Sequence, residues 1–403
     1  MSIFGDEFFE EKELMNILII GNGFDLNHDL PTKYWDFLNF CKYFLVNNGK
    51  EEYIDNKNVF NMLNYSVQEY IKKNVYANSN FRNKNIDELK EIINENIWIQ
   101  YFISNEECNN KGWIDFENEI CEMVKALDYL MKYLNHRNKS SGKIPIDDRE
   151  MFDKAYNFLD TIRTKNINGL KEKFEDPYDF RDDVARKIIV TLNNDLNNLI
   201  RCLEIYLEEC VEKIDIKFVS PDIASITKID KILSFNYTST FQRAYSFVNY
   251  EIDYIHGKLD ISKDISQNNM VLGIDEYLDE DEKNTDLDFI QFKKYFQRIY
   301  KKTGCNYKRW IEEMKEYSSY CNNIYIFGHS LDITDGDILK ELILMNNTTT
   351  TIFYLNNDVY AQQIANMVKI IGQDELINRV HGSNPSIIFK QQEPRIKNIK
   401  CMK

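Results

Sequence analysis

The sequence predicts an α/β protein in which strands alternate with helices and form a mainly parallel sheet. The first observation is the continuous apolar run Ile17–Ile20, which is typical of a strand buried on both faces. The run ends in Gly21 and Gly23, and apolar side chains then recur at helical spacing, which indicates a helix that starts near Thr32. Further short apolar runs return after residue 229. Strands that alternate with helices need crossover connections, and these favour parallel strands.

Five runs predict the later strands: residues 231–235, 252–255, 271–274, 324–327 and 351–355. Helices are expected after the last two runs, at residues 337–345 and 359–371. Residues 34–110 and 150–215 contain few turn residues, and apolar side chains repeat every three or four positions through 187–214, as in a long amphipathic helix. Residues 137–146 hold Ser, Gly and Pro and predict a loop. We therefore expect a Rossmann-like domain made of residues 1–33 and 216–403, with residues 34–215 as a large helical insertion.

Composition narrows the class of protein. The 403 residues include 50 Lys plus Arg and 65 Asp plus Glu, a formal net charge of −15. This balance argues against a broad nucleic-acid surface, which needs clustered cations. No apolar stretch reaches the roughly 18 residues of a membrane span, and the acidic start is unlike a secretory signal. The eight cysteines form no CxxC pair and the five histidines no zinc pattern. We expect a reduced, cytoplasmic protein without a metal and without a membrane anchor.

Candidate site residues follow the predicted strands, at the sheet edge where α/β proteins bind ligands. In Gly21-Asn22-Gly23-Phe24-Asp25, the two glycines allow a tight turn and close approach of a pyrophosphate to the amides. The third glycine of a full dinucleotide fingerprint is replaced by Leu26. The alternative interpretation is a tight strand-to-helix turn without a ligand.

The second strand end carries Asn236 and Tyr237. An Asn side chain has both a donor and an acceptor, so Asn236 is suited to hold a ribose hydroxyl or a water. The alternative interpretation is an Asn that caps the following helix. His256, followed by Gly257, closes the run 252–255, and a histidine is the natural general base near neutral pH. Its alternative interpretation is a structural histidine in a loop.

The fourth strand end is the segment 328–337, with Gly328, His329, Ser330 and Asp332. These residues are suited to an anion or a ribose, and the alternative is that they only cap the next helix. Outside the sheet, Glu117 lies in WIDFENEI and is the candidate for an insertion residue that reaches the site. Its alternative interpretation is the start of an amphipathic helix.

The blocks GNGFDLNHDLPTKYWDFL, WIDFENEI, ILSFNYTSTF, IHG and IYIFGHSLDITDGDIL, in this order, resemble the bacteriophage abortive infection AbiH family. Asp29 stands where that family commonly has a glycine. A wider resemblance is to sirtuin-like proteins, including NAD-hydrolysing proteins of antiphage defence. The positions of Gly21, Gly23, Asn236 and His256 are similar to their glycine loop, Asn and His-Gly. The chain lacks the four zinc cysteines of deacetylase sirtuins, so the resemblance does not extend to protein deacetylation.

The resemblance implies an antiphage effector that binds and hydrolyses NAD or NADP. It implies the catalytic candidates Asn236, His256, Asp25 and Glu117. The cofactor-binding candidates are Gly21, Asn22, Gly23, Phe24, Asp25, Tyr237, Gly328, His329, Ser330 and Asp332. A phage-derived trigger or partner protein, acting through the insertion, or assembly into a homo-oligomer would start the reaction.

Two other functions fit the same residues. One is a non-catalytic module that senses a nucleotide and passes the signal to a partner protein. The other is a metal-dependent nuclease, in which Asp25, Asp332, Asp335 and Asp337 would bind Mg²⁺, an ion that prefers oxygen ligands. The acidic composition weighs against the nuclease.

Overall fold

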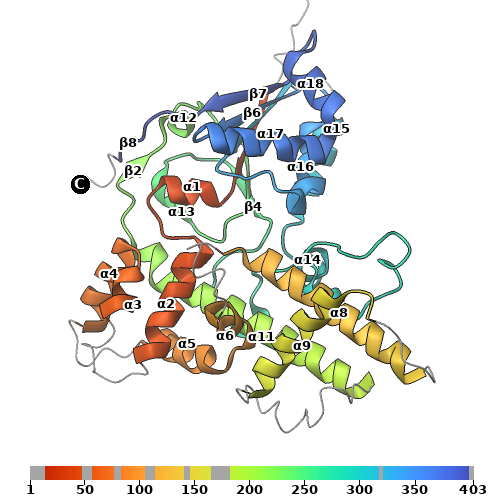
Figure 1. Ribbon diagram of the computed structural model, residues 1–403. Coiled ribbons are helices and arrows are strands. Elements are labelled where there is room, and N and C mark those ends of the chain that lie inside the picture. The colour runs from red at the N-terminus through yellow and green to blue at the C-terminus, as the bar shows by residue number, and fades with distance from the viewer. Residues whose placement is uncertain are drawn as a thin grey trace, which may run out of the picture. The chain divides into compact units, whose positions relative to one another are not determined.

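The computed structural model divides the chain into two compact units, which Figure 1 shows as a ribbon. It describes residues 14–47, 57–76, 83–104, 114–139, 146–164, 182–316 and 321–398. The first unit comprises residues 1–29, 216–255 and 304–403, and it carries the main sheet. The second unit comprises residues 30–215 and 256–303 and is mainly helical. The segment 256–303, which the sequence analysis placed with the sheet, groups with these helices.

The main sheet of the first unit has six strands, all parallel, in the order β4-β3-β1-β5-β6-β7. The strands are β1 (Leu14–Ile20), β3 (Lys231–Ser234), β4 (Glu251–Tyr254), β5 (Cys321–Phe327), β6 (Thr348–Tyr354) and β7 (Ile387–Gln391). Counted along the chain, this order is 3-2-1-4-5-6, which is the order of Rossmann-type sheets. The predicted α/β class with a parallel sheet is confirmed.

β1 is the central strand because it pairs with β3 on one side and with β5 on the other. Ile20 lies opposite Ser234 in one register and opposite Phe327 in the other. The apolar run Ile17–Ile20 is buried throughout, as expected for a strand covered on both faces. The strand ends of β1, β3 and β5 therefore lie next to one another at one edge.

Helices connect these strands within the first unit, and β6 contacts α17, which Figure 1 shows as a long helix. They are α1 (Asn22–Asn27), α12 (Pro221–Ala224), α13 (Thr240–Ala244), α15 (Asn306–Glu316), α16 (Gly336–Ile343), α17 (Asn357–Ile371) and α18 (Gln373–His381). A 3-10 turn, η6 (Ile333–Asp335), precedes α16. Two short strands, β2 (Phe218–Val219) and β8 (Ile396–Lys397), form a separate antiparallel pair.

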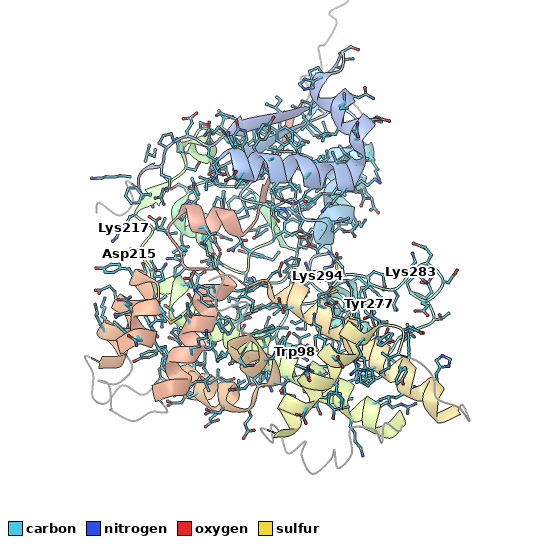
Figure 2. All side chains as sticks on the ribbon, viewed as in Figure 1. Trp98, Asp215, Lys217, Tyr277, Lys283 and Lys294 are labelled. Atoms are coloured by element: carbon cyan, nitrogen blue, oxygen red, sulfur yellow. The ribbon has the colours of Figure 1, made fainter. Side chains whose placement is uncertain are left out.

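The second unit is built around long amphipathic helices. Its helices are α2 (Tyr34–Asn47), α3 (Lys57–Met62), α4 (Tyr65–Ile71), α5 (Lys84–Glu95), α6 (Ile97–Ser104), α8 (Phe116–Lys139), α9 (Arg149–Thr164), α11 (Asp182–Glu209) and α14 (Lys294–Lys301). Its shorter turns are η1 (Lys72–Tyr76), η3 (Val211–Lys213), η4 (Ile265–Gln267) and η5 (Ile290–Phe292). Trp98, labelled in Figure 2, is fully buried and donates its indole N–H to the Leu192 carbonyl at 2.9 Å. Phe116 stacks on Phe102 with ring centres 4.4 Å apart.

The long helix predicted at 187–214 is confirmed as α11, which begins earlier and ends at Glu209. In the predicted loop 137–146, α8 continues to Lys139, and residues 140–145 lie outside the described residues. The helix expected near Thr32 begins at Tyr34.

The strand predicted at residues 271–274 is wrong, because the segment forms only an isolated bridge between Ile274 and Lys293. The Val271 and Ile274 N–H groups donate to the His256 and Phe292 carbonyls, both at 2.8 Å, whereas a side chain satisfies Leu272. The Gln297 amide accepts from the Leu272 N–H at 3.2 Å and donates to the Leu272 carbonyl at 3.0 Å. The apolar run therefore reflects burial of Val271 and Leu272, which a sheet strand and this segment share.

Among the described residues, no helix combines the length and the apolar character that crossing a membrane needs.

The contact of Gly328 with the loop after β1 generates a stability prediction. Gly328 has φ +68°, and a Cβ there would lie 2.0 Å from the Phe24 nitrogen. Gly372 is a matched control, because it has φ +87° and a Cβ there would meet nothing within 4 Å. Backbone strain alone costs about 1–3 kcal/mol at either position. We expect Gly328→Ala to lower the free energy of unfolding by clearly more than Gly372→Ala, measured by chemical denaturation. Equal losses would contradict the close contact.

Candidate functional site

Three of the sequence-predicted clusters meet at the carboxyl edge of the sheet. Gly21 follows β1, Phe235 follows β3 and Gly328 follows β5, and these three strands are neighbours. The strand order reverses between β1 and β5, which is where Rossmann-type sheets place a dinucleotide. The structure therefore brings together the glycine loop, the Asn236 segment and the Gly328 segment.

The loops after β1 and β5 touch backbone to backbone at this point. The Gly23 N–H donates to the Gly328 carbonyl at 2.7 Å, and the Gly21 N–H donates to the Phe327 carbonyl at 3.3 Å. A Cβ on Gly23 would lie 2.8 Å from the Gly328 Cα. The glycines are thus required for close packing of two protein loops.

This packing reduces the number of backbone amides that the glycine loop can donate to a ligand. The Phe24 N–H also has a partner, since it donates to the Gly21 carbonyl at 2.8 Å. Three of the amides expected to hold a diphosphate, those of Gly21, Gly23 and Phe24, therefore donate to protein carbonyls. The exposed residues beside this contact are Asn22 and Ser330.

Asn236 is held in one orientation by the loop after β1. Its Nδ2 donates to the Gly21 carbonyl at 2.9 Å. A carbonyl oxygen only accepts hydrogen bonds, so the amide nitrogen must face Gly21 and Oδ1 must point elsewhere. Oδ1 has no hydrogen-bond partner among the described residues. The site therefore contains a fixed amide acceptor at the end of β3, while Tyr237 beside it is half-buried.

Asp25 lies in α1 and is buried, with 1% of its surface exposed. Its Oδ2 accepts from the Thr238 hydroxyl at 2.7 Å. Thr238 in turn lies 3.0 Å from the Thr240 hydroxyl. Asp25 is thus a carboxylate enclosed by the protein, and any effect on a ligand acts through its charge.

The segment after β5 is anchored from both ends. The His329 Nδ1 accepts from the Leu331 N–H at 2.9 Å, so the neutral ring carries its proton on Nε2, which lies 3.6 Å from the Asp335 carboxylate. The ring of His329 also packs edge-on against Phe235. Leu331 has φ +57°, an uncommon conformation for a non-glycine residue. His329 therefore stabilises this loop from inside.

Two side chains of α17 hold the same segment, and neither of these residues was predicted from the sequence. The Gln363 Nε2 donates to the His329 carbonyl at 3.2 Å, and the Asn366 Nδ2 donates to the Ser330 carbonyl at 3.0 Å. Both residues are buried. In the sequence they are ordinary polar residues of a helix. Their partners are identified only when the structure places α17 beside the segment after β5. Asp332 is exposed and caps the next turn by accepting from the Thr334 N–H at 3.1 Å.

His256 and Glu117 belong to the second unit, and the three strand-end clusters belong to the first. His256 is buried, and its carbonyl accepts from the Val271 N–H at 2.8 Å. Gly257 after it has φ +76° and lies against the Asn269 carbonyl, so this turn requires a glycine. Glu117 lies in the first turn of α8 and is ion-paired with the buried Lys294, at 2.7 Å. Figure 2 labels Lys294 in this unit.

Asp115 supports the alternative interpretation of the WIDFENEI segment as a helix start. Its carboxylate accepts from the N–H groups of Glu117 and Asn118 at 3.1 and 3.2 Å, which is a helix N-cap. Trp113 lies outside the described residues.

His28 is a structural residue of the first unit. The Tyr245 hydroxyl accepts from the Ser220 N–H at 3.0 Å, so its own proton is available for the His28 Nε2 at 3.1 Å. The His28 Nδ1–H then donates to the Phe24 carbonyl at 2.7 Å. Burial lowers the pKa of His28 to about 4, so the ring is neutral at physiological pH.

Asp29 has a backbone conformation that favours glycine. Its φ is +60°, a conformation that Gly adopts without cost and that Asp tolerates better than most residues. Arg395 holds it through a contact of 2.6 Å to its carboxylate.

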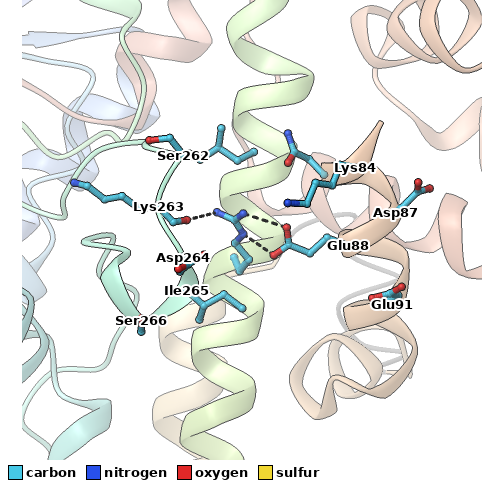
Figure 3. A pocket seen from close by; sticks show the side chains of 12 residues that line it. Lys84, Asp87, Glu88, Glu91, Ser262, Lys263, Asp264, Ile265 and Ser266 are labelled. Atoms are coloured by element: carbon cyan, nitrogen blue, oxygen red, sulfur yellow. Dashed lines mark hydrogen bonds and ion pairs between the residues drawn. The ribbon is translucent and has the colours of Figure 1, made fainter. Parts of the chain in front are cut away.

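A pocket in the second unit has a volume of about 860 Å³. Figure 3 shows Glu88 and the Lys263 backbone facing one guanidinium, that of Arg201, with Glu88 contacts of 2.8 and 3.1 Å. Its charged lining residues are Lys84, Asp87, Glu88, Glu91, Arg201, Lys263 and Asp264. Carboxylates exceed cations by one, and the guanidinium is already paired. The pocket is therefore poorly suited to a phosphate.

Among the described residues, no three His, Cys, Asp or Glu side chains group in a way that would hold a metal ion. Three of the four carboxylates considered for Mg²⁺ have other contacts: Asp25 accepts from Thr238, Asp332 caps a turn, and Asp335 faces His329.

Comparisons with known proteins agree with the resemblance to one family. The family model described as "Bacteriophage abortive infection AbiH" matches residues 17–354. No curated protein and no solved structure matches the chain. The resemblance to sirtuin-like proteins is not shown by these comparisons.

The neutral, buried His28 predicts a pH dependence of stability. Its pKa is about 4 in the folded state and about 6.5 in an unfolded chain. The unfolded state therefore binds this proton more tightly, and stability falls as the pH is lowered from 6.5 towards 4. We expect a contribution of roughly 3 kcal/mol to be lost over this window.

Chemical denaturation across this pH range, with His28→Gln and wild type, measures the effect. His28→Gln should be less stable at pH 7 and should have a flatter pH profile. The matched control is His381→Gln, at an exposed position of α18, which should keep the wild-type slope. An unchanged slope in His28→Gln would contradict the assignment.

Proposed function

Because the chain belongs to the bacteriophage abortive infection AbiH family, we propose that it defends against phage by binding and hydrolysing NAD or NADP. The proposed site is the carboxyl edge of the sheet in the first unit. Loss of the dinucleotide would stop phage growth together with the growth of the cell.

One observation carries the proposal: three polar strand ends meet where a sheet of order 3-2-1-4-5-6 reverses direction. This is the place at which such sheets bind dinucleotides. The acidic pocket of the second unit is a weaker candidate, because its carboxylates would repel the phosphates.

Asn236 is the residue to which the proposal gives the central role. Hydrolysis of the nicotinamide–ribose bond passes through an oxocarbenium-like state and needs a water or ribose hydroxyl in a defined position. The Gly21 carbonyl fixes the amide, which leaves Oδ1 to accept a hydrogen bond from that hydroxyl or water. The enclosed charge of Asp25 would favour the positive transition state.

Ligand contacts in this proposal are made mainly by side chains. The amides of Gly21, Gly23 and Phe24 are occupied, so the diphosphate would meet Asn22 and Ser330, which are exposed beside them. Tyr237, Gly328, His329 and Asp332 complete the edge. His256 and Glu117 remain candidates on sequence grounds, and substitution tests each of them separately.

A second candidate function is nucleotide sensing without turnover. It is favoured by the burial of Asp25 and by the hydrogen bond between Gly23 and Gly328. Both features leave few reactive groups exposed to a ligand. It predicts measurable affinity for a dinucleotide with no product.

The experiment measures NAD and NADP during phage infection in cells that carry wild type or Asn236→Ala. Wild type should deplete the pool, and Asn236→Ala should slow depletion by on the order of 10²-fold, because misplacement of a reacting group costs about this much. The matched control is Asn94→Ala, at an exposed asparagine of α5, which should deplete the pool like wild type.

His256→Ala is a further arm, and loss of depletion would place this residue in the chemistry. Unchanged pools in protected wild-type cells would contradict hydrolysis and leave the sensing function. In that case titration calorimetry with purified protein decides between a dinucleotide sensor and a protein that does not bind dinucleotides.

A further inference from the structure

Thr238 lies in the loop after β3, and Thr240 is the first residue of α13. Thr238 is 5% exposed and Thr240 is 1% exposed. Their hydroxyls are 3.0 Å apart, and the Thr238 hydroxyl is 2.7 Å from the Asp25 carboxylate. Two buried hydroxyls thus form a short chain that ends on a buried carboxylate.

The direction of the protons in this chain follows from the chemistry of the groups. An ionised carboxylate only accepts hydrogen bonds, so Thr238 gives its single proton to Asp25. The Thr238 oxygen is then an acceptor for the Thr240 proton. Hydrogen bonds in such a chain polarise one another, which strengthens the bond to the carboxylate.

The segment that follows β1 contacts or contains both groups that the proposed reaction uses, Asn236 and Asp25. Its Gly21 carbonyl orients Asn236, and Asp25 follows in the first turn of α1. A burial cost opposes charge on Asp25, so the donors from the β3 loop decide whether the charge persists and where it lies.

We propose that Thr238 and Thr240 are positioning residues, which hold Asp25 as an oriented anion beside the site formed by Gly21 and Asn236. This inference rests on the proposed function, because it gives the anion a role in dinucleotide cleavage. Thr238 acts through Asp25 and does not itself touch the ligand.

The experiment compares Thr238→Val, Thr238→Ser and Thr240→Val with wild type. Val has nearly the shape of Thr and lacks the hydroxyl, and Ser keeps it. Carbon-13 NMR of protein labelled at the Asp carboxyls follows the titration of Asp25, and Asp25→Asn identifies its signal. This readout needs no ligand and no turnover.

We expect Thr238→Val to raise the pH of half-titration of the Asp25 signal by about one unit or more, since hydrogen bonds to charged groups contribute this much. Thr238→Ser should restore the wild-type midpoint, and Thr240→Val should give a smaller shift in the same direction. The acid limb of the pH profile of dinucleotide consumption should move with the midpoint, so that Thr238→Val consumes about tenfold less than wild type at pH values below both midpoints. Thermal denaturation identifies any variant that fails to fold, and Thr240→Val and Thr238→Ser then carry the comparison.

The outcomes separate this inference from the proposed function. Shifted midpoints with no dinucleotide consumption in any protein would contradict hydrolysis, and the inference then requires loss of phage protection in Thr238→Val and its recovery in Thr238→Ser. An unmoved midpoint in Thr238→Val would overturn the inference even if wild type consumes the dinucleotide. Equal consumption by Thr238→Val and wild type would also overturn it.

Discussion

The hydrogen bond from the Gly23 N–H to the Gly328 carbonyl is the contact on which the candidate site depends. It joins the loops after β1 and β5 at 2.7 Å, and only residues without a Cβ allow this approach at Gly21, Gly23 and Gly328. The contact sets the start of α1 and thereby the position of Asp25. It also places the Gly21 carbonyl, which orients Asn236.

Two further interactions make this edge a connected polar structure. Thr238 ties the β3 loop to Asp25, while Gln363 and Asn366 hold the backbone of the β5 loop from α17. Most of these groups are buried and have protein partners, so the ligand-facing part is small. We expect a dinucleotide to be recognised through three polar groups: Asn236 Oδ1, Asn22 and Ser330. Membership in the abortive infection family supports the role in phage defence, and these groups support the chemistry proposed for it.

Much of the sheet could be predicted from apolar runs, because a parallel strand must be buried on both faces. The run Ile17–Ile20 is the clearest case, and its position between β3 and β5 agrees with its lack of polar residues. The strand predicted at 271–274 was wrong because these apolar residues are buried without pairing as a strand. At Leu272, Gln297 supplies the hydrogen bonds that a neighbouring strand would supply, and a side chain so far along the chain leaves no local signal.

The residues of the site were easier to predict than their roles. Glycines after a strand indicate that another group approaches the backbone closely, but the sequence does not say whether this group is a phosphate or another loop. Here it is the loop that contains Gly328. Asn236 was predicted as a polar strand-end residue, whereas the carbonyl that fixes its amide comes from Gly21, 215 residues away. The roles of Thr238 and Thr240 could not be predicted, since the function of a buried hydroxyl depends on its partners. The pairing of Glu117 with Lys294 joins the start of α8 to α14, and such long-range ion pairs are not visible in a single sequence.

The most direct test of the account is hydrogen exchange of the full chain, followed by mass spectrometry, with and without an excess of NAD or NADP. We expect slower exchange in peptides that cover residues 21–26, 234–240 and 328–335, because these segments form the proposed ligand-binding edge. Unchanged exchange in these three segments, or slowing confined to residues 84–91 and 261–266 around the acidic pocket, would contradict it.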